Sequence, residues 1–368
     1  MGNIIPTIMQ FVQSLSWENK MINEKIIDTH MHIEDWINDE YECIDCFEGH
    51  REQSGLASLN ICALGSSNMR CCVNNIVSAL YKIAHPNTYA HAGFDHIYRP
   101  ITENVPEGLD LVSQHRDYME IGFDGIKMIE GKPTCLKPLG GNLNNVALDK
   151  VYTEMEKNGT HVIFHMKDPE YFWKEKGCDG NYYGDGTYPS YEEIQKQAFE
   201  LFEKHPRLKV TLAHFFFCGE APEILEELFE KYPEMCVDLT PGCEMYHSFE
   251  ARHDFYKEFF KKHSKRVMLG TDGTFPWATR SHVWCIGILR DFISTEKKNM
   301  AFDDSILTGM GIDGEEKENI LYRNFENRVS KSPKPINKEA LRRYIDKWWH
   351  LISDDERAKI TPYIEKYL

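Results

Sequence analysis

The feature that most constrains the fold is a regular alternation of short apolar runs with longer segments of helical spacing. The apolar runs predict strands near residues 26–33, 56–64, 89–94, 125–129, 161–166, 209–216, 235–240 and 266–270. Between them lie amphipathic stripes such as Leu148, Val151, Tyr152 and Met155. Eight strands that alternate with helices in this way predict an α/β fold, a closed (β/α)8 or TIM barrel.

One barrel accounts for most of the 368 residues. We expect it to span residues 26–327. The apolar positions of residues 1–25 predict an amphipathic N-terminal leader helix. We do not expect a signal peptide, because no Lys or Arg precedes these apolar positions. After the last strand, Pro333 and Pro335 mark a linker into a helical C-terminal extension, residues 328–368.

Composition limits the partners. A formal charge of -16 excludes a nucleic-acid partner, since such proteins need a basic surface, and no apolar run is long enough to span a bilayer. The adjacent Trp348 and Trp349 are expected to be buried against the barrel or against a second subunit. A homo-oligomer is therefore one of the two alternatives. The eleven cysteines, including Cys43 and Cys46 at redox spacing, are expected to be reduced, which indicates the cytoplasm.

The first expected strand carries the strongest chemical signal. Its apolar start opens into Asp28-Thr29-His30-Met31-His32. Because side chains alternate along a strand, His30 and His32 point to the same side, which is the interior of a barrel. Two imidazoles placed in this way can share one metal ion.

Three later strand ends carry residues of the same kind. His165, His214 and Asp272 each follow an apolar run at the carboxyl end of an expected strand. Barrel active sites lie at that end, so residues far apart in the sequence converge there. Several histidines converging with an aspartate predict a metal site rather than a set of structural residues.

At these residues the sequence resembles the amidohydrolase superfamily, in particular its amidohydrolase-related (amidohydrolase 2) branch. The resemblance covers residues 26–327 and includes the His-x-His start, the strand-end histidines, Gly270-Thr271-Asp272 and Ile320-Leu321-Tyr322-Arg323-Asn324. It implies that His30, His32 and His165 are metal ligands, that Asp272 is a ligand or the catalytic base, and that His214 polarises the substrate.

Lys127, on the fourth expected strand, decides how many metals the resemblance implies. In some relatives a carboxylated lysine at this strand bridges two metals. We favour an uncarboxylated barrel or substrate-binding lysine and one metal, because the branch commonly works with one. Zinc suits the nitrogen-rich ligand set best, and manganese is the alternative.

The resemblance implies a metal-dependent hydrolase that cleaves an amide, ester or lactone of a small molecule through a metal-activated water. The main alternative is a metal-dependent, non-oxidative decarboxylase of an aromatic acid, and a hydratase of an unsaturated acid is a third. Lys127, Phe216 and Arg280 are the expected substrate-binding residues. The substrate itself is not fixed by the sequence.

Overall fold

The structure is a computed structural model. It describes residues 24–33, 51–52, 54–65, 70–95, 110–175, 182–242, 245–275, 279–300 and 306–368. The expected leader helix and Cys43 and Cys46 therefore lie outside the described residues, apart from positions 24 and 25.

Eight parallel strands form the sheet in sequence order, as predicted. They are β1 (Ile27–Ile33), β2 (Ser58–Cys62), β3 (Tyr89–Gly93), β4 (Gly125–Gly131), β5 (His161–Met166), β6 (Lys209–Leu212), β7 (Cys236–Asp238) and β8 (Val267–Met268). A short ninth strand, β9 (Gly273–Phe275), continues β8 and pairs with β1.

Two hydrogen bonds between β1 and the segment that follows β8 complete the ring. Thr29 N donates to Leu269 O at 3.1 Å, and Asp272 N donates to His30 O at 2.9 Å. The segment after β8 thus joins β1, while β8 itself pairs with β7. The predicted (β/α)8 barrel is confirmed.

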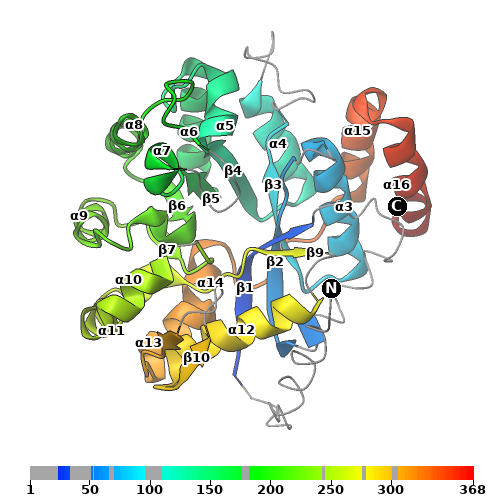
Figure 1. The fold of residues 1–368 in the computed structure, drawn as a ribbon. Coiled ribbons are helices and arrows are strands. Elements are labelled where there is room, and N and C mark those ends of the chain that lie inside the picture. Colours follow the sequence, from blue (N-terminus) through cyan, green and yellow to red (C-terminus); the bar gives the residue numbers. More distant parts are fainter. Residues whose placement is uncertain are drawn as a thin grey trace, which may run out of the picture.

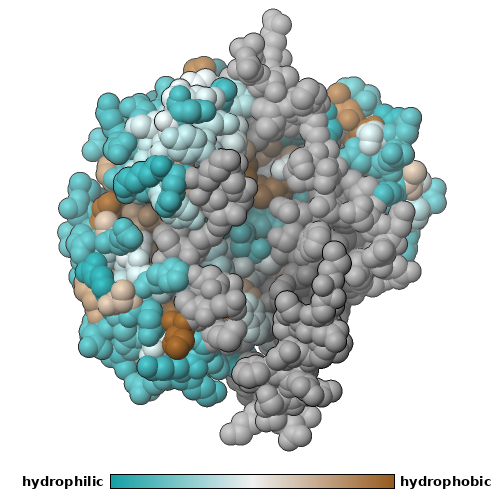
Figure 2. All heavy atoms as spheres, viewed as in Figure 1, coloured by the Kyte–Doolittle hydropathy of each residue, from teal (hydrophilic) through white to brown (hydrophobic). Residues whose placement is uncertain are grey.

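Helices surround the sheet (Figure 1). The longer ones are α3 (Cys71–Ala84), α4 (Leu111–Ile121), α6 (Val146–Asn158), α8 (Tyr191–Lys204), α9 (Glu223–Lys231), α11 (His253–Lys262) and α12 (Thr279–Ser294). Each of the first six buries an apolar stripe against the strands or neighbouring helices, and the predicted stripe of α6 is fully buried. Their outward faces are mostly hydrophilic over α8, α9 and α11 (Figure 2).

Several shorter helices and a hairpin connect the longer elements. They are α5 (Pro133–Leu136), α7 (Tyr171–Lys174), α10 (Met245–Ala251), α13 (Gly314–Glu318), α14 (Asn324–Arg328) and the hairpin β10 (Lys298–Met300) with β11 (Ile306–Thr308). Single-turn helices at Lys137–Leu139, Ser264–Arg266, Asn319–Arg323 and Trp349–Leu351 lie between them. Within the described residues, no helix combines the length and the apolar character needed to cross a membrane.

The C-terminal region folds back on the barrel. After a non-helical segment, residues 329–337, come α15 (Lys338–Trp348) and α16 (Asp354–Tyr367). α15 packs on α3 and α4, where Asn75 Nδ2 donates to Tyr344 OH at 3.2 Å and Lys347 Nζ lies 2.6 Å from Asp117 Oδ2. Trp348 is 8% exposed and belongs to the main core, so the chain's own barrel buries this tryptophan.

The sixth strand is shorter than predicted. It ends at Leu212 rather than at Phe216, because His214 through Phe217 all have positive φ angles between 49° and 56°. A pleated strand needs φ near −120°, so these residues leave the sheet. They form a left-handed turn within the 3-10 segment Ala213–Phe217.

Candidate metal centre

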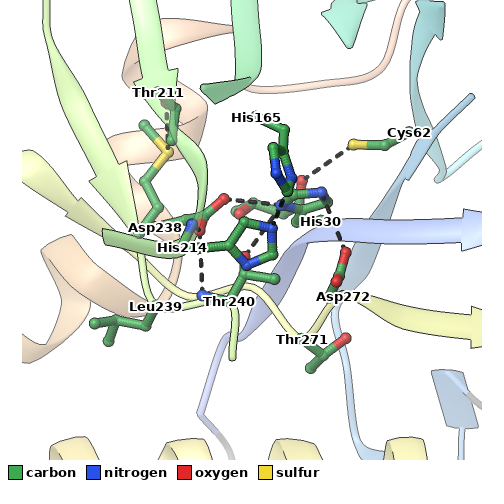
Figure 3. Close-up of polar contacts among 12 residues, drawn as sticks. His30, Cys62, His165, Thr211, His214, Asp238, Leu239, Thr240, Thr271 and Asp272 are labelled. Carbon is green, nitrogen blue, oxygen red and sulfur yellow. Dashed lines mark hydrogen bonds and ion pairs between the residues drawn. The ribbon is translucent and has the colours of Figure 1, made fainter. Parts of the chain in front are cut away.

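His30 and His32 lie side by side inside the barrel, as the strand alternation predicted. Both are buried, and His30 Nε2 lies 3.1 Å from His32 Nε2. Figure 3 shows His30, His165, His214, Asp238 and Asp272 converging on this point from different strands. The carboxyl ends of the strands therefore meet where barrel enzymes place their chemistry.

The partners of the two rings fix where their protons sit. His30 Nδ1 lies 2.9 Å from Asp238 Oδ2, and His32 Nδ1 lies 2.7 Å from Cys62 O. A carboxylate and a carbonyl accept hydrogen bonds but donate none, so each neutral ring carries its proton on Nδ1. The two Nε2 atoms then face each other as lone pairs, with no proton to share.

Asp272 adds a third acceptor. Its Oδ1 lies 3.0 Å from His32 Nε2 and 3.5 Å from His30 Nε2. Ligand atoms of His30, His32 and Asp272 all lie within 4.8 Å of one another. Three acceptors directed at one point are stabilised by a cation, and the two nitrogens and one oxygen suit a first-row divalent metal.

Lys127 lies at the same point and donates from Nζ to His30 Nε2 at 2.7 Å. It is 2% exposed. Burial lowers the pKa of Lys127, while the nearby acidic groups, including Asp272, act to raise it. Lys127, which was predicted to be a barrel or substrate-binding lysine, thus lies inside the barrel beside His30.

The electrostatics keep the centre suited to a metal. Burial, and next to it the Lys127 charge, lower the pKa of His30 to about 4. Burial acts to raise the pKa of Asp272, yet its contacts with His32 and the neighbouring histidines outweigh this and hold the pKa well below its ordinary value. Neutral imidazole and ionised carboxylate are the forms that bind metals.

His165 and His214 form a second pair beside this group. His165 Nε2 lies 2.8 Å from Asp168 Oδ1, and Asp168 Oδ2 accepts from Tyr183 OH at 2.8 Å. His165 therefore carries its proton on Nε2, and its Nδ1 lone pair lies 3.2 Å from His214 Nε2. His165 is not a member of the 4.8 Å group that the described residues form, although the sequence placed it there.

Asp238, at the end of β7, is a residue of the candidate site that sequence reasoning missed. Its Oδ2 holds His30, and its Oδ1 accepts from the backbone N–H groups of His214 at 2.9 Å and Thr240 at 3.2 Å. Burial acts to raise the pKa of Asp238, but His30 outweighs it and the pKa is lowered. The signal was present, because Asp238 closes an apolar strand as Asp272 does.

Backbone strain gathers at the same end of the barrel. In the described residues, every non-glycine residue with positive φ follows β5, β6 or β8, and these are Lys167, His214, Phe215, Phe216, Phe217 and Asp272. Such conformations cost about 1–3 kcal/mol each and persist where the surroundings enforce them, often at functional sites. The strain places His214 and Asp272 beside the histidines of β1.

The other two predicted substrate-binding residues are Phe216 and Arg280. Phe216 is fully buried, with Lys167 Nζ 4.2 Å from its ring centroid, so the structure packs this ring in the core. The next residue, Phe217, is partly exposed and lies against His214. Arg280 falls at the start of α12, and its side chain lies outside the described part of the chain.

No family model matches the sequence, and no curated protein matches it either. Several solved structures, however, have a similar fold. An uncharacterised TIM-barrel protein, Bb4693 from Bordetella bronchiseptica, is 14% identical with a TM-score of 0.53, covering 83% of this chain and 99% of its own.

Two similar structures have a named activity. A 2,6-dihydroxybenzoate decarboxylase from Rhizobium is 12% identical with a TM-score of 0.52, over 83% of this chain and 98% of its own. A dihydroxybenzoic acid decarboxylase from Polaromonas sp. JS666 has bound manganese and the inhibitor 2-nitroresorcinol. It is 11% identical with a TM-score of 0.50, and the match covers 83% of this chain and 97% of its own. The chain shares the barrel fold of these proteins.

Proposed function

We propose that this protein is a metal-dependent enzyme of the amidohydrolase superfamily that acts on a small molecule, with one divalent ion held by His30, His32 and Asp272. One observation carries the proposal: the Nε2 lone pairs of the two histidines face each other and an ionised carboxylate. Zinc and manganese both suit this mixed nitrogen and oxygen set. When bound, such an ion supplies Lewis acidity, which activates water or polarises a substrate oxygen.

The chain's own residues supply the remaining functions. Asp272 is ionised and 38% of its side chain is exposed, so it can accept a proton from a reacting group. The ring centroids of His214 and His30 are 5.9 Å apart. His214 is therefore close enough to donate a hydrogen bond to a substrate oxygen that lies beside the proposed metal ligands. The ammonium group of Lys127, which is not carboxylated in this proposal, attracts an anionic group of the substrate.

His165 enters the proposal as a further ligand that uses Nδ1. Asp168 occupies its Nε2, which leaves the Nδ1 lone pair facing His214. Asp168 and Asp238 then have parallel roles, since each carboxylate orients one histidine. Carboxylates that hydrogen-bond metal-ligating histidines are the common arrangement in metal sites.

Hydrolysis of an amide, ester or lactone is the first candidate reaction, because it needs a base such as Asp272 beside the metal. Non-oxidative decarboxylation of an aromatic acid is the second. It is supported by the two decarboxylases that share the fold and by a buried lysine able to hold a carboxylate. The two reactions use the same ligands and differ in their products.

The experiment combines metal analysis with a substrate screen. Protein expressed with added zinc or manganese should hold about one equivalent of metal per chain. Lactones, esters and amides would be tested for released acid, and ortho-hydroxy aromatic acids for released carbon dioxide. Protein that binds no metal and shows no metal-dependent turnover in either arm would refute the proposal.

A further inference from the structure

An aromatic ring that the metal-site argument does not use lies directly against the centre. The ring of Phe217 is stacked on that of His214, with centroids 5.1 Å apart and planes 23° apart. It also meets the ring of His165 at 5.6 Å. Phe217 is thus in contact with both histidines of the second pair.

The left-handed turn separates this ring from its neighbours. Phe215 and Phe216 are fully buried, and Phe215 packs against Phe249 and the aromatic side chains of α11. Phe217 alone of the three keeps part of its surface exposed. A right-handed helix would not present these side chains in the same directions, so the strained turn is what holds Phe217 at the site.

Gly242, in the segment after β7, gives the ring room. A Cβ at this position would lie 3.2 Å from Phe217 Cε1 and 3.5 Å from His214 Cβ. The first distance is tighter than ordinary van der Waals contact, so a side chain would displace the ring from its place beside His214. The absence of a side chain at residue 242 and the stack on His214 together fix where the ring lies.

We propose that Phe217 is a specificity-determining residue, whose ring selects substrates with a planar, conjugated group next to the atoms held at the metal centre. This inference rests on the proposed function and adds a substrate class to it. Offset or edge-to-face pairs of aromatic rings gain about 0.5–1.5 kcal/mol beyond the burial of their area. A saturated ring of similar size gains the burial alone, so the expected preference for the planar ring is about 2- to 10-fold.

The test compares two ligands on metal-loaded protein. Calorimetry would measure the affinities of 2-hydroxybenzoate and of its saturated counterpart, 2-hydroxycyclohexanecarboxylate. We expect the wild type to favour the planar acid, and Phe217→Leu to lower the ratio of the two affinities by about 2- to 10-fold. Phe217→Tyr should keep the ratio, because the aromatic ring remains.

A matched control is available on α11, where Phe255 is also partly exposed. Phe255→Leu should leave the ratio unchanged. An unchanged ratio in Phe217→Leu, or a wild type with no preference for the planar acid, overturns the inference. Metal content measured on the same samples reports on the proposed function separately, since leucine at residue 217 removes no ligand atom.

Discussion

Two clusters of histidines lie within this barrel, and they are built differently. The upper cluster, at the carboxyl ends of the strands, contains His30, His32, His165 and His214. The lower cluster, nearer the amino ends, contains His91 and His161. The same sheet encloses both clusters, and of these six histidines His165 alone is partly exposed, so the main difference between them is in the partners.

The lower cluster is a chain of satisfied hydrogen bonds. His91 Nδ1 donates to Asn60 Oδ1 at 2.7 Å, and Asn60 Nδ2 in turn donates to Thr29 O. His91 Nε2 then accepts from His161 Nδ1 at 2.8 Å, and His161 Nε2 accepts from Thr211 Oγ1 at 2.9 Å. Each ring nitrogen has a partner of the opposite kind, so neutral rings suffice.

The upper cluster is completed only in part in this way, because Lys127 Nζ donates to His30 Nε2 while His32 Nε2 faces other acceptors. Carboxylates or a carbonyl hold the outer nitrogens of His30, His32 and His165, and the inner nitrogens face one another. His214 Nδ1 has no hydrogen-bond partner among the described residues. The comparison teaches that burial and residue type do not distinguish the two clusters, whereas the direction of the ring lone pairs does.

The largest expected effect separates the clusters outright. His30→Ala should release the metal and abolish turnover, because it removes one of the three converging ligand atoms. His91→Gln should keep the metal, since His91 contributes none. Elemental analysis of both purified variants measures this, and a His30→Ala protein with full metal content would remove the distinction.

A smaller effect should come from Asp272, which we propose both binds the metal and accepts a proton. Asp272→Asn should lower turnover by about 100-fold or more, because the amide cannot accept a proton. The amide oxygen still faces the histidines, so we expect metal to be retained. Steady-state kinetics at saturating metal give the result, and normal turnover would show that Asp272 is not the base.

The next test compares the residues that orient a histidine in each cluster. Asp238→Ala frees His30 Nδ1 and should weaken metal affinity about 10- to 100-fold. Asn60→Ala frees His91 Nδ1 and should cost about 1–3 kcal/mol of unfolding free energy with little change in metal affinity. Metal titration and chemical denaturation would be run on both variants, and equal metal affinities would contradict the contrast.

The smallest effect is a dependence of stability on pH in the metal-free protein. Burial lowers the pKa of His161 from 6.5 to about 3. Between these values the unfolded chain binds a proton that the folded chain does not, so the free energy of unfolding falls as the pH falls.

Removing this histidine should therefore flatten the profile. His161→Gln should reduce the slope between pH 6 and pH 4 by up to ~1.4 kcal/mol per pH unit, the value for one proton. Denaturant unfolding at several pH values measures the slope. Identical slopes in the variant and the wild type would mean that His161 is already protonated in the fold.

The fold was predictable because its signals are local. Each strand of the barrel shows as an apolar run, and the positions of His30 and His32 follow from the alternation of side chains along β1. The partners of those rings were not predictable, since Asp238 lies 208 residues from His30. Nothing in the residue types announced the left-handed turn that buries Phe216 and exposes Phe217, because phenylalanine disfavours positive φ.

The return of α15 to α3 and α4 has a consequence for how the chain is made. A ribosome produces Asn75 269 residues before Tyr344, its hydrogen-bond partner, and Asp117 230 residues before Lys347. During that interval the faces of α3 and α4 that later receive α15 have no cover, and such surfaces promote aggregation of unfinished chains. The docking of α15 on these two helices is therefore a late step, which follows synthesis of nearly the whole chain.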